Sequence, residues 1–254
     1  MATDYLLFAT DFMRRIKILF IWFSAVFAVV GFCACTEKST EEDDVQAMIL
    51  TVCKNASGTV YLLDDDTTTT YIPSPALVLH DSLVGRRCYV EYSYLSPATD
   101  YTYTINLTYA HIACESKVVL VDSDAAMAAL GDAALSPVWV WVSGHYLNVL
   151  FDYYGTSLTE HKFSLAHDVR AVAPLDSMLT VELRHHLNGD APKALLSEVA
   201  SFDLAPLALD TAGVSYLRVK YRTFDGGDAH TDVAIPANLR RQAVRAKHFG
   251  TFRP

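Results

Sequence analysis

The segment YTYTINLTY, residues 101–109, alternates strictly between two kinds of side chain. Its odd-numbered positions carry tyrosine, isoleucine or leucine, and its even-numbered positions carry threonine or asparagine. Successive side chains of a strand point to opposite faces of a sheet. The segment therefore predicts a strand over Tyr101–Ala113, with one face in a core and the other in water.

Short runs rich in Val, Tyr, Thr and Leu lie on both sides of this segment, separated by clusters of Gly, Pro, Asp and Ser. This pattern is typical of an all-β protein, and no regular alternation of strands with long helices is seen. One helical turn is predicted over Asp124–Leu130, ending at Gly131. The predicted strands are Ala47–Cys53, Gly58–Asp65, Val84–Leu95, Val118–Val121, Val138–Val142, Tyr146–Tyr154, Lys162–Leu165, Met178–Leu187, Glu198–Leu204 and Val214–Phe224.

A short polar break near Glu115–Lys117 divides these strands into two blocks. We predict a small β-barrel over residues 46–115 and a β-sandwich over residues 116–236, because many short strands with punctuated turns favour a sandwich. Residues 237–254 form a tail in which a short helix is expected. The clusters Asp64–Asp66 and Asp225–Asp228 are interpreted as hairpin turns, since neither has the spacing of a calcium loop.

The composition limits the classes of function. The chain has 254 residues, 52% of them hydrophobic and 19% charged, which indicates a folded protein rather than a disordered one. Its formal net charge of -9 disfavours a nucleic-acid partner, because phosphate binding needs clustered Lys and Arg. No Gly-x-Ser-x-Gly, His-Glu-x-x-His, Walker or dinucleotide motif is present, so no catalytic residue and no cofactor is predicted.

The N-terminal region resembles a signal peptide that ends in a lipidation site. The run Ile18–Phe32 holds no charged residue and follows Arg14, Arg15 and Lys17, and at fifteen residues it is short for a membrane span of about 20. Small Ala34 precedes Cys35, as in a bacterial lipobox. We predict that residues 1–34 are cleaved and that Cys35 is acylated.

Two alternatives remain open at this end of the chain. The apolar run can instead be an uncleaved anchor helix, and Met13 can be the true start. A cleaved signal peptide and an uncleaved anchor helix both place the rest of the chain beyond a membrane. Residues 35–45 carry five carboxylates and are interpreted as a disordered acidic tether. We expect an outer-membrane lipoprotein that carries several acyl chains, on either the periplasmic face or the cell surface.

Several side chains in the body are candidates for sites. Arg218, Lys220 and Arg222 share one face of a predicted strand, where three like charges call for acidic neighbours or an anionic partner, so we predict partner binding there. Adjacent His185 and His186 would point to opposite faces, so no metal site is predicted.

Two other sets of residues are interpreted as structural. Trp139 and Trp141 would share one face of a strand that is apolar on both sides, and we interpret them as core rather than as a platform for sugars or bases. Cys53, Cys88 and Cys114 lie in apolar or alternating runs, where buried thiols are favoured, and three cysteines allow at most one internal disulfide.

Five motifs resemble the NigD-like lipoproteins of Gram-negative anaerobes. GTVYL (residues 58–62) and GRRCYVEY (85–92) are similar to the small OB-like barrel of that family, and GHYLNVLF (144–151), VELRHH (181–186) and SFDL (201–204) are similar to its C-terminal β-sandwich. The resemblance covers nearly the whole chain. It implies a fold and an envelope location but no catalytic residue, because the family has no established activity. The proximity of family members to bacteriocin-associated genes implies an accessory role.

The resulting hypothesis is a non-enzymatic envelope lipoprotein that binds a membrane through its lipid and has an envelope protein or a glycan as partner. Two alternatives are kept open: a glycan-directed envelope hydrolase with dispersed catalytic residues, and a bacteriocin-associated accessory or immunity-type protein.

Overall fold

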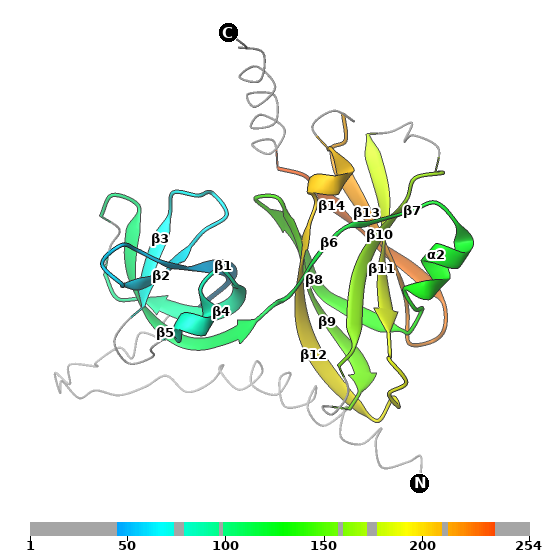
Figure 1. The fold of residues 1–254 in the computed structure, drawn as a ribbon, viewed down its shortest axis with the longest axis horizontal. Coiled ribbons are helices and arrows are strands. Elements are labelled where there is room, and N and C mark those ends of the chain that lie inside the picture. Colours follow the sequence, from blue (N-terminus) through cyan, green and yellow to red (C-terminus); the bar gives the residue numbers. More distant parts are fainter. Residues whose placement is uncertain are drawn as a thin grey trace, which may run out of the picture. The chain divides into compact units, whose positions relative to one another are not determined.

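The computed structural model describes residues 45–73, 79–96, 99–156, 160–171, 177–209 and 213–236. The predicted signal peptide, Cys35, the tether up to residue 44 and the tail 237–254 lie outside these ranges. The described residues form β-sheets almost throughout, which confirms the predicted all-β class (Figure 1). Two units follow one another along the chain, a closed barrel and a sandwich of two sheets.

The first unit is a five-stranded closed barrel with the strand order β1-β2-β3-β5-β4. Its strands pair antiparallel, except that β3 runs parallel to β5. The barrel is filled by apolar side chains from every strand, among them Leu50, Leu62, Val90 and Ile105. The strands are β1 (Gln46–Lys54), β2 (Val60–Leu63), β3 (Thr70–Pro73), β4 (Arg87–Tyr94) and β5 (Thr102–Ile112).

The predicted core face of residues 101–109 is only partly confirmed. Ile105 and Leu107 are buried in the barrel, but Tyr101 and Tyr109 are 70% and 48% exposed. Tyr101 lies ahead of β5 with a φ of 60°, outside the regular strand. The pairing of β4 with β5 shifts register between Glu91 and Tyr92. Such a bulge re-aims the side chains that follow it, which explains why Tyr109 does not continue the buried row.

The second unit packs two sheets face to face. One sheet has the order β14-β13-β11-β10-β7 and the other the order β6-β12-β9-β8. The strands are β6 (Cys114–Lys117), β7 (Val119–Val121), β8 (Leu135–Ser143), β9 (Tyr146–Gly155), β10 (Lys162–Asp168), β11 (Met178–His186), β12 (Ala194–Asp203), β13 (Tyr216–Arg222) and β14 (Asp228–Ala234).

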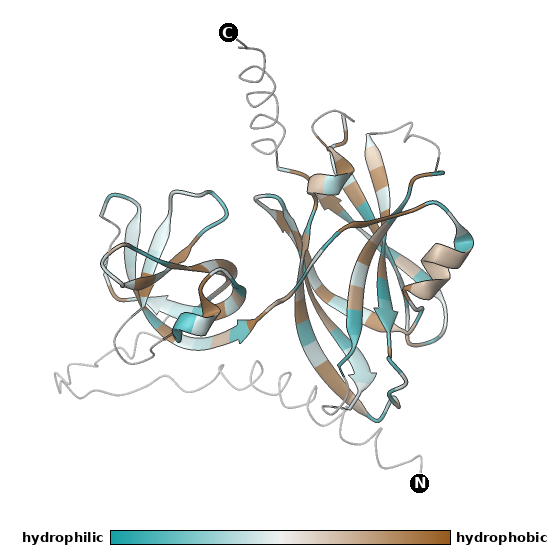
Figure 2. Cartoon of the chain, in the orientation of Figure 1, coloured by the Kyte–Doolittle hydropathy of each residue, from teal (hydrophilic) through white to brown (hydrophobic). Residues whose placement is uncertain are grey.

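The core of the sandwich comes from alternate residues of both sheets. Phe151 of β9 and Phe202 of β12 are completely buried, and Leu217 and Val219 of β13 lie in the same cluster. Hydrophobic and hydrophilic residues alternate along these strands (Figure 2). The period of two therefore determines which side chains face the core and which are left for an outer face.

The sequence analysis missed three strands, β3, β6 and β14. The predicted polar break at Glu115–Lys117 was wrong, because these residues belong to β6, an edge strand that pairs in parallel with β12. Charged residues are common on edge strands, where they discourage pairing with other chains, so an edge strand can have the composition of a loop. The chain passes from barrel to sandwich at Ala113, between β5 and β6.

The one α-helix among the described residues is α2 (Asp124–Ala129), as the sequence predicted. The Ser123 side chain caps it by accepting a hydrogen bond from the Ala126 N–H at 3.3 Å. Gly131 follows with a φ of +83°, and a Cβ there would lie 2.5 Å from the carbonyl oxygen of His185. Only glycine fits this turn, which directs the next residue, Asp132, towards the outer face of the five-stranded sheet.

Two 3-10 turns complete the described elements, Asp81–Leu83 and Ala205–Leu207. Within the residues that the structure describes, no helix is both long and apolar enough to cross a membrane. Cys53, Cys88 and Cys114 are free thiols. Burial raises the pKa of Cys88, and it raises the pKa of Cys114 to about 12, so both stay protonated at neutral pH.

Candidate functional site: a polar hollow on the five-stranded sheet

The predicted partner-binding residues lie together on β13. Leu217 and Val219 are completely buried in the sandwich core, so the intervening Arg218, Lys220 and Arg222 point to the outer face of the five-stranded sheet. The alternation that the sequence indicates therefore places the three cations in one row.

The neighbouring strand β14 supplies acidic partners for two of these three cations. Arg218 donates two hydrogen bonds to Asp232, at 2.8 and 2.7 Å, and Arg222 donates one to Asp228 at 3.0 Å. The hydrogen bonds from Arg218 lower the pKa of Asp232. Strand β14 therefore pairs with the ends of the row, as expected for like charges on adjacent positions of one face.

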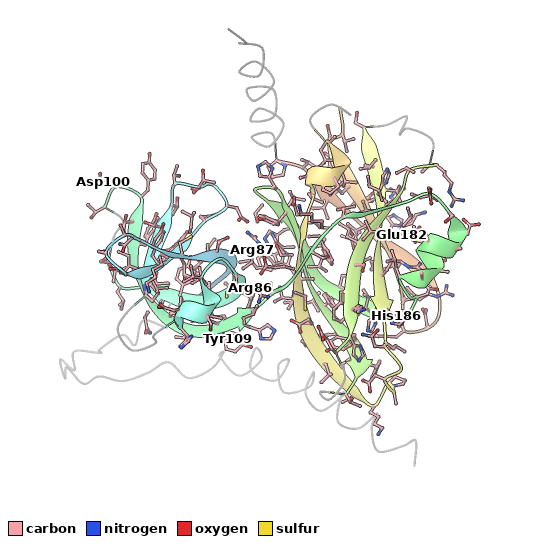
Figure 3. All side chains as sticks on the ribbon, viewed as in Figure 1. Arg86, Arg87, Asp100, Tyr109, Glu182 and His186 are labelled. Carbon is pink, nitrogen blue, oxygen red and sulfur yellow. The ribbon has the colours of Figure 1, made fainter. Side chains whose placement is uncertain are left out.

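Lys220 occupies the middle of the row and differs from its neighbours. The strand register places it between His230 of β14 and Glu182 of β11. It is exposed, and within the described residues its ammonium group makes no ion pair. Glu182 instead accepts a hydrogen bond from Arg184 at 3.2 Å. The position of Glu182 on β11 can be followed in Figure 3. Lys220 is therefore a cation available to a ligand.

These side chains border a hollow of about 430 Å³. Asp132, in the loop after α2, reaches Arg184 at 3.0 Å and Arg222 at 3.5 Å. The Arg184 side chain is only 14% exposed, and its buried Nε has no hydrogen-bond partner among the described residues. The lining residues are Asp132, Glu182, Leu183, Arg184, Lys220, Tyr221, Arg222, Asp228, Ala229 and His230.

The lining of the hollow is mostly charged. It has charges of both signs. Its arginines form ion pairs with carboxylates, and within the described residues Lys220 forms none. An ammonium group in this setting attracts anionic groups more strongly than the neutralised arginines do. The sequence identified Lys220 and Arg222, but it gave no signal for Arg184 and Asp132, which come from elements distant in sequence.

The adjacent histidines lie as predicted on opposite faces of β11. His185 is 1% exposed and His186 faces outward. Within the described residues, no group of three or more His, Cys, Asp or Glu side chains is placed to hold a metal ion. The sequence analysis missed the partners of His185. A ring nitrogen of His185 lies 2.7 Å from one of His161, and the other ring nitrogen of His161 contacts Asp190.

The hydrogen bonds of this buried cluster use every ring nitrogen. The carbonyl of Ala134 can only accept, so His185 Nδ1 donates to it at 3.3 Å, and His185 Nε2 lies 2.7 Å from His161 Nδ1. His161 Nε2 donates to Asp190 Oδ2 at 2.9 Å. Gly155 allows this close packing, since a Cβ there would lie 2.6 Å from the His161 ring. Both rings are buried, and each ring nitrogen faces a partner within the protein.

Acid should destabilise the protein through this cluster. Burial lowers the pKa of His185 from 6.5 to about 4, so between these pH values the unfolded chain binds more protons and stability falls as the pH falls. The hydrogen bond from His161 lowers the pKa of Asp190, whose contribution is lost below its ordinary value of 3.8. We expect urea midpoints to decrease steadily from pH 6.5 to pH 4.

The matched variants for this prediction are His185→Gln, which removes the buried titrating group, and His230→Gln, which removes an exposed histidine. Urea unfolding of each at several pH values should show a flatter profile for His185→Gln and a wild-type profile for His230→Gln. Equal slopes in the wild type and His185→Gln would contradict the assignment.

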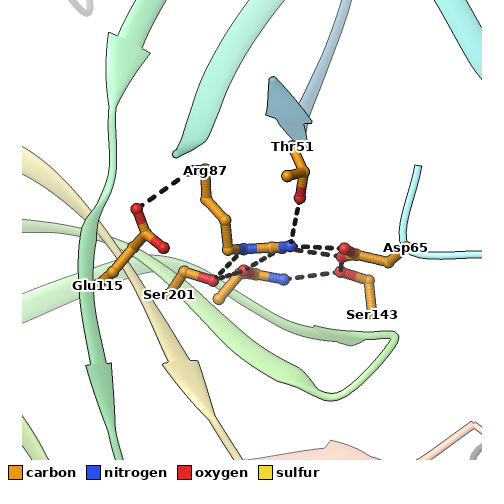
Figure 4. A network of polar contacts seen from close by, with 7 residues as sticks. Thr51, Asp65, Arg87, Glu115, Ser143 and Ser201 are labelled. Atoms are coloured by element: carbon orange, nitrogen blue, oxygen red, sulfur yellow. Dashed lines mark hydrogen bonds and ion pairs between the residues drawn. The ribbon is translucent and has the colours of Figure 1, made fainter. Parts of the chain in front are cut away.

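A buried polar network joins the barrel to the sandwich (Figure 4). Arg87 of β4, 1% exposed, donates to both carboxylate oxygens of Asp65 at 2.5 and 2.8 Å and to Ser201 of β12 at 2.6 Å. Its guanidinium lies 3.7 Å from the ring centroid of Tyr146 in β9. Asn148 completes the network through Ser143 and Ser201. This junction could not be predicted locally, because Arg87 and Asp65 resemble ordinary surface residues of a strand and a turn.

The interpretation of both tryptophans as core was wrong. The two indoles share one face of β8, as predicted, but that face is the outer one. Trp141 packs on a small cluster between barrel and sandwich that includes Ile49 and Val199, and Trp139 is 46% exposed. Val140 and Val142 take the core face instead. The strand is apolar on both sides because its outer face meets the barrel over part of its length.

Comparisons with known proteins agree with this architecture. Residues 117–235 match the family described as the NigD-like C-terminal beta sandwich domain. No curated protein matches the chain. Three solved structures show the same fold, and each is less than 25% identical to this chain.

A protein of unknown function, DUF1344, from Bacteroides vulgatus is 22% identical, with a TM-score of 0.64 over 76% of this chain and 91% of that one. A predicted lipoprotein from Bacteroides fragilis is 12% identical, with a TM-score of 0.57 over 76% and 98% of the two chains. A NigD-like immunity protein from Bacteroides caccae is 16% identical, with a TM-score of 0.52 over 74% and 92%. The second unit of this chain is therefore a NigD-like C-terminal β-sandwich domain, as the motifs of its sequence indicated.

Proposed function

We propose that the chain is an envelope lipoprotein, anchored through acylated Cys35, that acts as a binding or accessory module without catalysis of its own. The observation that carries the binding role is the polar hollow, in which paired arginines surround the unpaired ammonium of Lys220. The NigD-like domain, and solved structures named as a predicted lipoprotein and as an immunity protein, support an accessory role in the envelope.

The partner that fits this surface presents an anionic group to Lys220. Carboxylates already hold Arg218 and Arg222, so a partner gains most at the middle of the row. Asp132 and Glu182 border the same hollow and repel a partner of uniformly negative charge. We therefore favour an envelope protein with a mixed surface over a polyanion, because complementary charges of both signs also fix the orientation of binding.

A photo-crosslinking residue placed at His230, which lines the hollow from the outer face of β14, tests this role in intact cells. We expect a defined adduct with the otherwise unaltered chain. Adding Lys220→Glu should weaken binding about tenfold, or ~1.4 kcal/mol, and reduce the adduct accordingly. Adding Lys193→Glu, an exposed lysine that does not line the hollow, should leave the adduct unchanged.

Two outcomes contradict the proposal: no adduct forms from position 230, or the adduct persists at the original level with Lys220→Glu. The identity of the adduct separates the accessory role from its main alternative. A bacteriocin as the partner would favour an immunity-type function, as in the name of the solved NigD-like immunity protein. A resident envelope protein as the partner would favour the general accessory role.

A further inference from the structure

The two indoles of β8 form an aromatic platform that the polar hollow does not use. Trp139 and Trp141 stack with ring centroids 4.2 Å apart and an interplanar angle of 25°. Trp141 is held from the other side by the cluster between barrel and sandwich. One ring is therefore anchored, and it fixes the orientation of its exposed neighbour.

The strand register shows what borders the exposed indole on the outer face of the four-stranded sheet. Trp139 lies opposite Leu150 of β9, and Leu150 lies opposite Val199 of β12. This row is apolar. Leu150 and Val199 belong to the cluster between barrel and sandwich, in which Val199 is only 2% exposed, so the Trp139 indole is the open end of this row.

The next row along the same face is polar. Ser136, Asp152 and Ser197 lie opposite one another on β8, β9 and β12. The Ser197 hydroxyl donates to Asp152 Oδ1 at 2.6 Å. Asp152 is a diagonal neighbour of Trp139, a spacing of about 7–8 Å that a bound ring can bridge. A flat apolar surface thus adjoins a carboxylate and two hydroxyl groups.

This combination selects one class of occupant. A pyranose ring with equatorial hydroxyls has a flat C–H face that can lie on an indole, while its hydroxyls donate to a carboxylate. A single-stranded nucleic acid would bring phosphates next to Asp152, where the adjoining rows contain no cation. An apolar helix would bury the Asp152 carboxylate against hydrocarbon.

We propose that Trp139, supported by Trp141 and bordered by Asp152, forms a binding site for a neutral glycan built of β-linked, gluco-configured units. The site lies on the four-stranded sheet and the polar hollow lies on the other, so each can fail without the other. The proposal goes beyond the accessory role, because it gives the protein a direct contact with a glycan.

Isothermal titration of the full chain with chitohexaose and cellohexaose tests the proposal, in a detergent without a sugar headgroup. We expect saturable binding of at least one of them, with quenching of tryptophan fluorescence. Trp139→Ala should weaken binding at least tenfold, Trp139→Phe should retain part of the affinity, and Asp152→Asn should weaken it severalfold. Tyr101→Ala removes an exposed ring of the barrel and should bind as the wild type does.

A urea midpoint equal to that of the wild type would show that Trp139→Ala is folded. Three results would overturn the proposal: neither oligosaccharide binds, binding is unchanged in folded Trp139→Ala, or oligothymidylate binds in preference to both sugars. If Trp139→Ala misfolds, Trp139→Phe still tests the proposal, because it keeps an aromatic ring. Its affinity for the oligosaccharide should lie between that of the wild type and background.

Discussion

Replacing Arg87 by methionine is expected to lower the free energy of unfolding by about 3–5 kcal/mol. The Asp65 carboxylate is only 6% exposed and would remain buried without its cation. The variant also loses the hydrogen bond to Ser201 and the contact with the Tyr146 ring. Because these contacts join the barrel to the sandwich, we further expect a single unfolding transition to separate into two.

The neighbouring residue provides a matched control. Arg86 donates to Glu115 at 2.9 Å, but its side chain is 48% exposed, so Arg86→Met should cost about 0–1 kcal/mol. Urea unfolding followed by tryptophan fluorescence measures both variants. Combining Arg87→Met with Asp65→Leu should recover much of the loss, since apolar replacement of a buried ion pair is often tolerated. Equal costs for the two methionine variants would show that the junction is not held by this network.

The strands that the sequence predicted well are rich in apolar and β-branched residues. The alternation along residues 214–224 placed Leu217 and Val219 in the core and the three cations outside, because period-two burial needs no information from elsewhere in the chain. Two of the missed strands, β6 and β14, lie at sheet edges and are largely polar. In β14 the outward residues Asp228, His230 and Asp232 are polar and only Val233 is buried, so the strand resembled a loop.

Contacts between distant segments could not be predicted in this way. Arg87 and Ser201 are 114 positions apart, and His161 and Asp190 meet only because β9, β10 and β11 converge. The error over Trp139 has a similar origin. An apolar outer face is buried where a second unit covers it and exposed beyond that cover, and the local sequence is the same in both places.

Cys35, which lies outside the described residues, carries the most decisive expectation for the biological role. We expect the chain to incorporate fatty acid only when this thiol is present. The diacylglyceryl and amide-linked chains of a lipoprotein both attach to the lipobox cysteine. Cys33→Ala, two positions earlier, is the matched control and should be labelled as the wild type is. Cys35→Ala should be unlabelled and should lose its membrane anchor.

Metabolic labelling with an alkyne fatty acid, combined with fractionation of the cells, therefore tests the account most directly. The account predicts label and membrane recovery for the wild type and Cys33→Ala, and neither for Cys35→Ala. Recovery of an unlabelled wild-type chain from the cytosol, with residues 1–34 still attached, would contradict it.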